Sequence, residues 1–158
     1  MKHRQDNPLP PQVLKGEGLD LHFDRLVPCA PNDRGFVPFY HFKIVINGAT
    51  QVGHINFKVG DTDHILRCAG HIGYEISEGH RGKAYSFHAC NALAPFIRTI
   101  YDAVVITVSP ENPASIRIIQ RLGCQFMDEI EISAPEPAYI KGERFKQRYR
   151  WHLKRGRT

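Results

Sequence analysis

The first half of the chain alternates apolar and polar residues with the period of two that is typical of half-buried strands. Leu19, Leu21 and Phe23 are each followed by a polar residue, which places the apolar side chains on one face of a strand. The dipeptide Asn47-Gly48 separates two further apolar runs and is the strongest short-range signal for a hairpin. We expect a turn at residues 60–63, a short strand after it, and principal strands over residues 19–27, 39–46, 51–59 and 71–77.

The second half changes to the spacing of helices. Six apolar residues fall on what would be one buried helical face: Ala89, Ala92, Leu93, Phe96, Ile97 and Ile100. Pro95 lies within this helix and should kink or divide it, because proline lacks an amide hydrogen. A second, short helix has Asn112 as its N-cap, Pro113 in its first position and Gly123 just after its end.

Strands flank the second helix. The β-branched run over residues 103–109 predicts a well-buried strand, and residues 129–132 and 147–153 predict the last two. With no repeat and no linker, 158 residues fit a single α+β domain with mostly antiparallel strands. Residues 1–18 carry three prolines and are predicted to form a flexible N-terminal arm, so that residues 19–158 make up the domain.

A net charge of +5 and a pI near 9.1 favour anionic ligands, which include nucleotides, cofactors and nucleic acid. Many of the cations lie after residue 140, where they alternate with aromatic residues, a pattern that can mark RNA contact. No nucleic-acid-binding motif accompanies them. We therefore favour an edge strand with a basic exposed face and with Tyr149 or Trp151 in the core.

The cysteines are scattered and form no C-x-x-C pair, which favours free thiols in a reducing compartment over a disulfide framework: Cys29, Cys68, Cys90 and Cys124. The nine histidines lack metal-ligand spacing, so no metal is expected. The first residues lack the apolar run of a signal peptide, and no segment reaches the ~18 apolar residues of a membrane span. We expect a cytoplasmic protein without membrane contact.

The most informative segment covers residues 71–86, where a buried strand precedes a basic turn of small residues and the start of a helix. This order places free backbone N–H groups, a helix N-terminus and the cations Arg81 and Lys83 at one point. Such an arrangement suits a pyrophosphate. The alternative is an ordinary solvated turn before a helix.

The strand IGYEIS and the turn RGKAYS, followed by the strand VVITVS and the block ENPASIRIIQRLGCQF, resemble the GNAT superfamily of acyl-CoA-dependent N-acetyltransferases. The turn is similar to the family signature Q/R-x-x-G-x-G/A, and the later block is similar to its N-x-x-S/A…G-F motif. The resemblance implies a mixed, mostly antiparallel central sheet that splays between the strands 71–77 and 103–109, with helices on both faces. It also implies transfer of an acetyl group from acetyl-CoA, as co-substrate, to a primary amine by direct attack in a ternary complex.

The resemblance also assigns roles to residues. The turn would hold the pyrophosphate of the cofactor through Arg81, Gly82, Lys83, Ala84, Tyr85 and Ser86. Backbone groups of Tyr74 and Ile76 would bind the acetyl and pantetheine portions, where main-chain donors stabilise the forming oxyanion. Asn112 and Ser115 match the paired polar positions of the second motif, and Ser115 is the general-acid candidate.

Each catalytic assignment has an alternative. Ser115 also suits a first helical turn, and Asn112 caps a helix without any ligand. Glu75 is the general-base candidate because it lies on the splayed strand between two cofactor-binding residues. A water-mediated base or simple surface exposure of Glu75 is the alternative, and His71 is a weaker candidate.

The sequence departs from the family pattern at several positions. Ala84 and Ser86 occupy the glycine positions of the turn, which leaves the loop competent if neither position needs a positive φ. Ile119 stands where many members carry a tyrosine that protonates the thiolate, and Cys124 with Gln125 interrupts the usual Gly-Phe pair. Two alternatives therefore stay open: a non-catalytic acyl-CoA-binding regulatory module, and a basic RNA- or ribosome-associated protein.

The resemblance leaves the acceptor unassigned between a small molecule and a protein N-terminus. The helices that cover the acceptor in the family have no counterpart in the short loop after the first predicted strand. A homodimer is common among similar proteins.

Overall fold

The computed structural model describes residues 7–153. Within them the chain forms eight strands: β1 (Val13–Lys15), β2 (Asp20–Val27), β3 (Phe39–Ile46), β4 (Thr50–Lys58), β5 (Ile72–Ile76), β6 (Ala103–Val108), β7 (Gln125–Glu131) and β8 (Phe145–His152). The helical segments of the same residues are the π-helix η1 (His64–Ala69), the 3-10 turn η2 (Glu78–His80), α1 (Tyr85–Ile97), α2 (Pro113–Arg121) and α3 (Pro137–Ile140).

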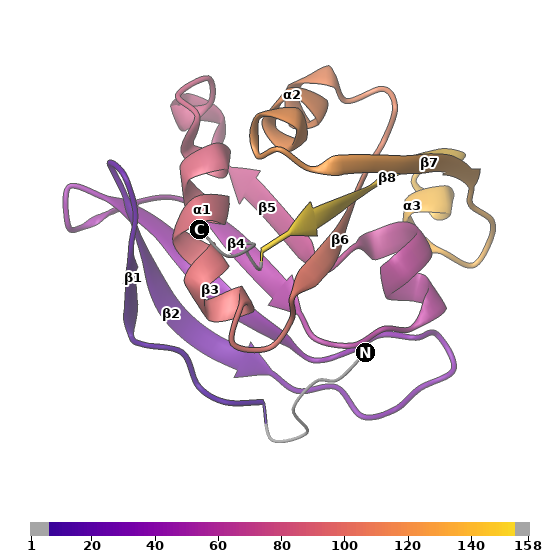
Figure 1. The fold of residues 1–158 in the computed structure, drawn as a ribbon, viewed down its shortest axis with the longest axis horizontal. Helices are drawn as coiled ribbons and strands as arrows, with labels where there is room; N and C mark the ends of the chain where they lie inside the picture. The colour runs from indigo at the N-terminus through magenta and orange to yellow at the C-terminus, as the bar shows by residue number, and fades with distance from the viewer. Residues whose placement is uncertain (1–6, 154–158) are drawn as a thin grey trace.

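The strands form two antiparallel sheets, which diverge between β5 and β6 (Figure 1). The first sheet has the strand order β1-β2-β3-β4-β5, and the second has the order β6-β8-β7. The predicted α+β fold and the splay between these two middle strands are thereby confirmed. The divergence divides the central sheet into two, so each strand pairing within the described residues is antiparallel.

His71 joins the two sheets at the end where they meet. Its N–H donates to the carbonyl of Val105 at 2.8 Å, and the N–H of Val105 donates to His71 Nδ1 at 3.0 Å. Because Nδ1 accepts, the ring proton lies on Nε2, which is 3.1 Å from the carbonyl of Gly60 and 3.2 Å from Asp61 Oδ1. Burial lowers the pKa of His71, although Asp61 opposes the effect. His71 therefore has a structural role, because its hydrogen bonds join the two sheets, and the prediction that it is a second candidate for the general base is wrong.

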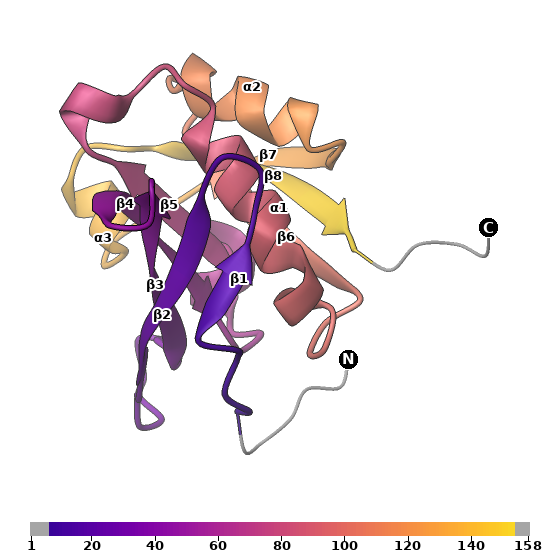
Figure 2. The ribbon, with the colours of Figure 1, turned by 90° about the vertical axis from the view of Figure 1, so that its left-hand side faces the viewer.

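One face of the five-stranded sheet carries the core. Tyr40, Phe42, Ile55 and Phe57 are fully buried there, and Phe96 of α1 packs edge-on against the Tyr40 ring at a centroid distance of 4.9 Å. Figure 2 shows α1 lying along this sheet. Because side chains alternate along a strand, the intervening positions lie on the opposite face. We call this the outer face; it carries His41, His54, Asn56, Lys58, Gly73 and Glu75.

Local signals placed the turns and caps correctly. Asn47 and Gly48 both have positive φ, 54° and 76°, as a two-residue hairpin turn requires. Asn112 Oδ1 accepts a hydrogen bond from the N–H of Ser115 at 3.2 Å, with Pro113 opening α2. Gly123 follows the helix with a φ of 82°. The predicted hairpin and the predicted second helix are confirmed.

Two expectations before α1 are wrong. Part of the predicted arm over residues 1–18 is strand β1, because Val13–Lys15 pair with β2 and Leu14 is buried; residues 1–6 lie outside the described part. The segment after the turn at 60–63 is the π-helix η1 and not a short strand. Ile65 and Cys68 are its buried residues, so its apolar positions serve a helical face.

Two further expectations, one for the helix that contains Pro95 and one for the C-terminal strand, also need correction. The predicted helix is not divided at Pro95, because α1 continues to Ile97; so close to the end of a helix, a missing N–H removes little. Strand β8 is the central strand of its sheet and not an edge strand. Tyr149 and Trp151 of β8 are buried as predicted.

Candidate functional site

The exposed main-chain edge of β5 forms one wall of the site. The bonds from Lys58 N to His71 O and from Ser77 N to Val52 O, 2.7 and 2.8 Å long, fix the odd-numbered residues as those that pair with β4. The N–H and C=O groups of the even-numbered residues therefore point toward the divergence between the sheets: Ile72, Tyr74 and Ile76. Two of these are the residues whose backbone the sequence assigned to cofactor binding.

The turn after β5 leads into a cavity of about 470 Å³. Gly82, Ala84, Tyr85 and Ser86 line it, at the point where α1 begins. Ala84 has a φ of 63° and is thus left-handed, a conformation that costs about 1–2 kcal/mol for an L-residue other than glycine. The sequence-based condition that neither glycine position needs positive φ therefore fails at Ala84, whereas Ser86 lies in the helix. Ala84 thus adopts the left-handed backbone conformation that a glycine would adopt there, and the loop is strained at this residue.

Of the two cations expected from the sequence, Arg81 lines this cavity. Arg81 Nε donates to the carbonyl of Ile76 at 2.9 Å, so this side chain ties the turn to the end of β5. Lys83 is exposed on the turn, outside the cavity lining. Arg117 and Arg121, one turn apart on α2, also line the cavity and were not predicted from the sequence. Their i, i+4 spacing was the available signal.

Tyr74 and Ser115 meet across the divergence. The Tyr74 hydroxyl and Ser115 Oγ are 3.1 Å apart, and Ser115 is held in place because its N–H bonds the cap residue Asn112. Burial raises the pKa of Tyr74 to about 12, although the bond to Ser115 opposes the shift. Tyr74 is therefore a neutral hydrogen-bond donor at physiological pH. The phenol reaches α2 from β5, whereas position 119, the family's tyrosine position, holds a buried isoleucine.

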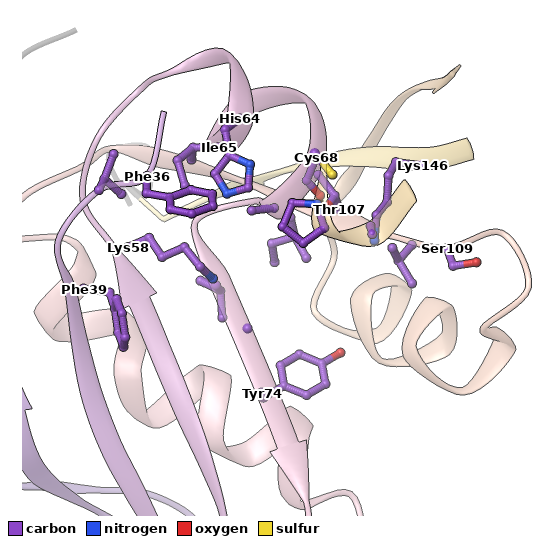
Figure 3. A pocket seen from close by; sticks show the side chains of 18 of the residues that line it. Phe36, Phe39, Lys58, His64, Ile65, Cys68, Tyr74, Thr107, Ser109 and Lys146 are labelled. Atoms are coloured by element: carbon purple, nitrogen blue, oxygen red, sulfur yellow. Dashed lines mark hydrogen bonds between the residues drawn. The ribbon is translucent and has the colours of Figure 1, made fainter. Parts of the chain in front are cut away.

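A second cavity, of about 680 Å³, lies on the other side of this pair. Tyr74 and Ser115 line both cavities, so they form the partition between them. The larger cavity is lined by two outer-face residues, Gly73 of β5 and Lys58 of β4, and by residues of β6 and η1. Figure 3 shows Lys58 and Lys146 reaching into it from different strands, with Tyr74 at its lower edge.

Lys58 is the main residue that the sequence reading missed. Its half-buried side chain lies over Gly73, where a Cβ on the glycine would be 3.3 Å from Lys58 Nζ. Burial lowers its pKa to about 8. Within residues 7–153, Nζ forms no hydrogen bond or ion pair. The sequence did contain a signal for this position: His54, Asn56 and Lys58 alternate along β4 and so place three polar side chains on its outer face.

Glu75 lies on the same outer face as Gly73, two residues along β5. Its side chain is 67% exposed, and Oε1 is 3.9 Å from His54 Nε2. It also lines the smaller cavity. The carboxylate is thus accessible to solvent on the outer face.

Cys68, Cys90 and Cys124 are poor nucleophiles. All four cysteines are free, and burial raises the pKa of Cys68 and of Cys124 to about 12 and that of Cys90 still further. No group of three or more histidine, cysteine or acidic side chains suited to a metal occurs among the residues described. None of the helices described is long and apolar enough to cross a membrane.

The basic tail is partly neutralised. Arg148 forms a two-point ion pair with Asp128, with both N–O distances 2.8 Å, and Lys146 Nζ lies 2.9 Å from Glu143 Oε1. The tail cations after Leu153 lie outside the described residues.

Comparisons with known proteins agree on the family. The model of the acetyltransferase (GNAT) domain matches residues 21–125, which is more than half of the chain. No curated protein matches the sequence closely enough to count as a relative. Among solved structures, a probable GNAT-family acetyltransferase from Chromobacterium violaceum is 12% identical, with a TM-score of 0.64 over 92% of this chain and 88% of that one.

Two further neighbours hold the family's co-substrate or its product. The microcin self-immunity acetyltransferase MccE, in complex with acetyl-CoA and AMP, is 16% identical, with a TM-score of 0.56 over 72% of this chain and 61% of that one. The ribosomal-protein alpha-N-acetyltransferase RimL, in complex with coenzyme A, is 17% identical, with a TM-score of 0.58 over 75% of this chain and 63% of that one. The chain thus spans about three fifths of these two proteins and shares their fold. Through the domain match and this fold, the chain belongs to the GNAT acetyltransferase family.

Proposed function

We propose that this protein transfers the acetyl group of acetyl-CoA to a primary amine by direct attack in a ternary complex. Acetyl-CoA is the co-substrate of the family. The observation that carries the proposal is the pair of cavities that meet at Tyr74 and Ser115, beside the free main-chain edge of β5. Two compartments with one shared wall suit two substrates whose reacting groups must meet.

The smaller cavity takes the cofactor. The N–H groups of the turn and of the first residues of α1, including Ala84, Tyr85 and Ser86, bind the pyrophosphate, because a helix N-terminus leaves its first N–H groups unpaired. Gly82 and Lys83 belong to the same turn, and Arg117 and Arg121 add positive charge from α2. Tyr74 and Ile76 pair their main-chain groups with the pantetheine arm.

The larger cavity takes the acceptor, which must lose a proton before it attacks. Glu75 receives this proton, directly or through water, since its exposed carboxylate lies on the outer face beside Gly73. Main-chain N–H groups at the free edge of β5 stabilise the oxyanion. As the C–S bond breaks, the Tyr74–Ser115 pair donates a hydrogen bond to the departing thiolate, and Ser115, oriented by Asn112, delivers a proton that it regains from water.

The acceptor belongs to one of two classes, a small amine or a protein N-terminus. RimL and the Vibrio fischeri ribosomal-protein-alanine acetyltransferase, at 17% and 18% identity, act on proteins by name. MccE, at 16%, is named for self-immunity to microcin. A location in the cytoplasm accords with the four free thiols.

Calorimetric titration with acetyl-CoA tests the cofactor half of the proposal. We expect micromolar binding by the wild type, loss of binding by Ala84→Trp, and retained binding by Ala84→Gly, which keeps the left-handed backbone without strain. An acetyl-transfer screen over amines and N-terminal peptides tests the other half, with Ser115→Ala expected to lower kcat at least about tenfold. Tight cofactor binding with no transfer to any acceptor would instead favour the regulatory module, and no binding at millimolar acetyl-CoA would refute the proposal.

A further inference from the structure

The larger cavity carries a charge pattern that the proposed reaction does not explain. Its lining holds the cations Lys58, Lys141 and Lys146 against a single carboxylate, that of Glu143. Lys146 is already paired with Glu143, and Lys141 is exposed at the rim. Lys58 alone reaches the interior without a counter-charge within the described residues.

The position of Lys58 relates it to the reacting atoms. Nζ lies above Gly73, on the strand whose next residue, Tyr74, contacts Ser115 at the partition. Because Gly73 has no side chain, there is room above it for the amino group of Lys58. Whatever group approaches the partition from the outer face therefore passes close to this ammonium.

Glu75 supplies the opposite charge on the same face. It is two residues from Gly73 on an extended strand, about 7 Å along the chain. A positive and a negative side chain thus flank Gly73 on the outer face. A simple cationic amine would meet repulsion at Lys58, whereas a molecule with an amine and an anionic group matches both charges.

We propose that the acceptor is a primary amine that also bears an anionic group, a carboxylate or a phosphate, and that Lys58 binds this group while the amine faces Glu75. The inference rests on the proposed function for the identity of the reacting amine, but the anion subsite is a property of the cavity itself. The low pKa of Lys58, about 8, fits an amine deprived of its counter-ion, and bound anion would raise that pKa.

Matched probe pairs test the proposal by calorimetry on the protein saturated with coenzyme A, which has no acetyl group to transfer. Glycine is compared with glycinamide, and O-phosphoethanolamine with ethanolamine. We expect the anionic member of at least one pair to bind at least about tenfold more tightly than its neutral partner. The two pairs separate a carboxylate from a phosphate site.

Three variants assign the effect. Lys58→Met should abolish the preference, and Lys58→Arg should keep it, because arginine keeps the positive charge. Lys43→Met, which removes an exposed lysine from the neighbouring strand β3, is the control and should bind as the wild type does. The same ratios should appear in kcat/KM for acetyl transfer.

Several results would overturn the inference. These are equal affinity for both members of each pair, no binding of any probe, and an unchanged preference in Lys58→Met. If Lys58→Arg and Lys58→Met instead lose turnover equally while probe binding is unaltered, Lys58 acts as a base and not as an anion site. Failure of the proposed function would look different: anionic probes would still bind in a Lys58-dependent way, but no amine would be acetylated.

Discussion

Replacement of Lys58 by methionine should stabilise this protein at neutral pH. Methionine fills similar space without a charge, so the change removes an ammonium group that burial destabilises. Burial lowers the pKa of Lys58 from 10.5 to about 8, a difference of about 2.5, and 1.36 kcal/mol per pKa unit gives about 3 kcal/mol as the upper limit. Because the amine faces a cavity open to water, we expect about 1–2 kcal/mol in the free energy of unfolding.

The pH dependence of this gain has a definite sign. Between pH 8 and 10.5 the unfolded chain holds the Lys58 proton and the folded chain does not, so wild-type stability from this group rises with pH. The penalty is complete below pH 8 and disappears toward pH 10.5. The advantage of Lys58→Met should therefore be largest at pH 7 and shrink steadily above pH 8.

Urea unfolding of the wild type, Lys58→Met and the exposed control Lys43→Met measures this at pH 7 and at pH 10. We expect a higher midpoint for Lys58→Met at pH 7 with an unchanged m value, and no change for Lys43→Met. A variant that is less stable at pH 7, or an advantage that is equal at both pH values, would refute the reasoning.

Three further outcomes follow from contacts elsewhere in the site. Ala84→Gly should raise the free energy of unfolding by about 0.5 kcal/mol, because relief of the left-handed alanine outweighs the entropy cost of glycine; thermal unfolding that shows a loss would contradict this. Asn112→Ala should cost about 1 kcal/mol through the lost cap, with Asn112→Asp as the control that keeps the acceptor oxygen. Because burial lowers the pKa of His71, the contribution of this residue to stability should be fully present above pH 6.5 and should fall with acidification below it. Urea midpoints measured against pH should lose this slope in His71→Asn. An unaltered slope would contradict the structural role of a neutral His71.

The elements that the sequence predicted correctly are those specified by neighbouring residues. The Asn47-Gly48 hairpin and the Asn112, Pro113 and Gly123 signals of α2 act within a few residues, so no long-range information is needed. Strand β1 was not predicted, because three residues are too few to show a periodic pattern. Only their pairing with β2 makes them a strand. The central place of β8 depends on the order of strands far apart in the sequence.

In the candidate site, too, the features predicted from the sequence are those formed by neighbouring residues. The turn over residues 81–86 was recognised because it is contiguous, but the partition joins Tyr74 to Ser115, 41 residues later. The family resemblance assigned Tyr74 a backbone role only, and the position of its phenol becomes clear only when α2 packs beside β5. Lys58 was missed for a related reason, because a lysine at a strand end is ordinarily solvated and only the surrounding cavity makes it unusual.

The divergence of the two sheets explains why binding groups gather at this place. A strand in the middle of a molecule normally satisfies its main-chain groups on both edges, because unpaired buried N–H and C=O groups are costly. Beyond the hydrogen bonds of His71, β5 pairs with a strand on one side only among residues 7–153. Arg81 satisfies the carbonyl of Ile76 from the turn. A carbonyl oxygen has two lone pairs, so it can accept from Arg81 and from an amide of the pantetheine arm together. Arg81 thereby positions the turn against the edge that the cofactor completes, rather than competing with the cofactor for it.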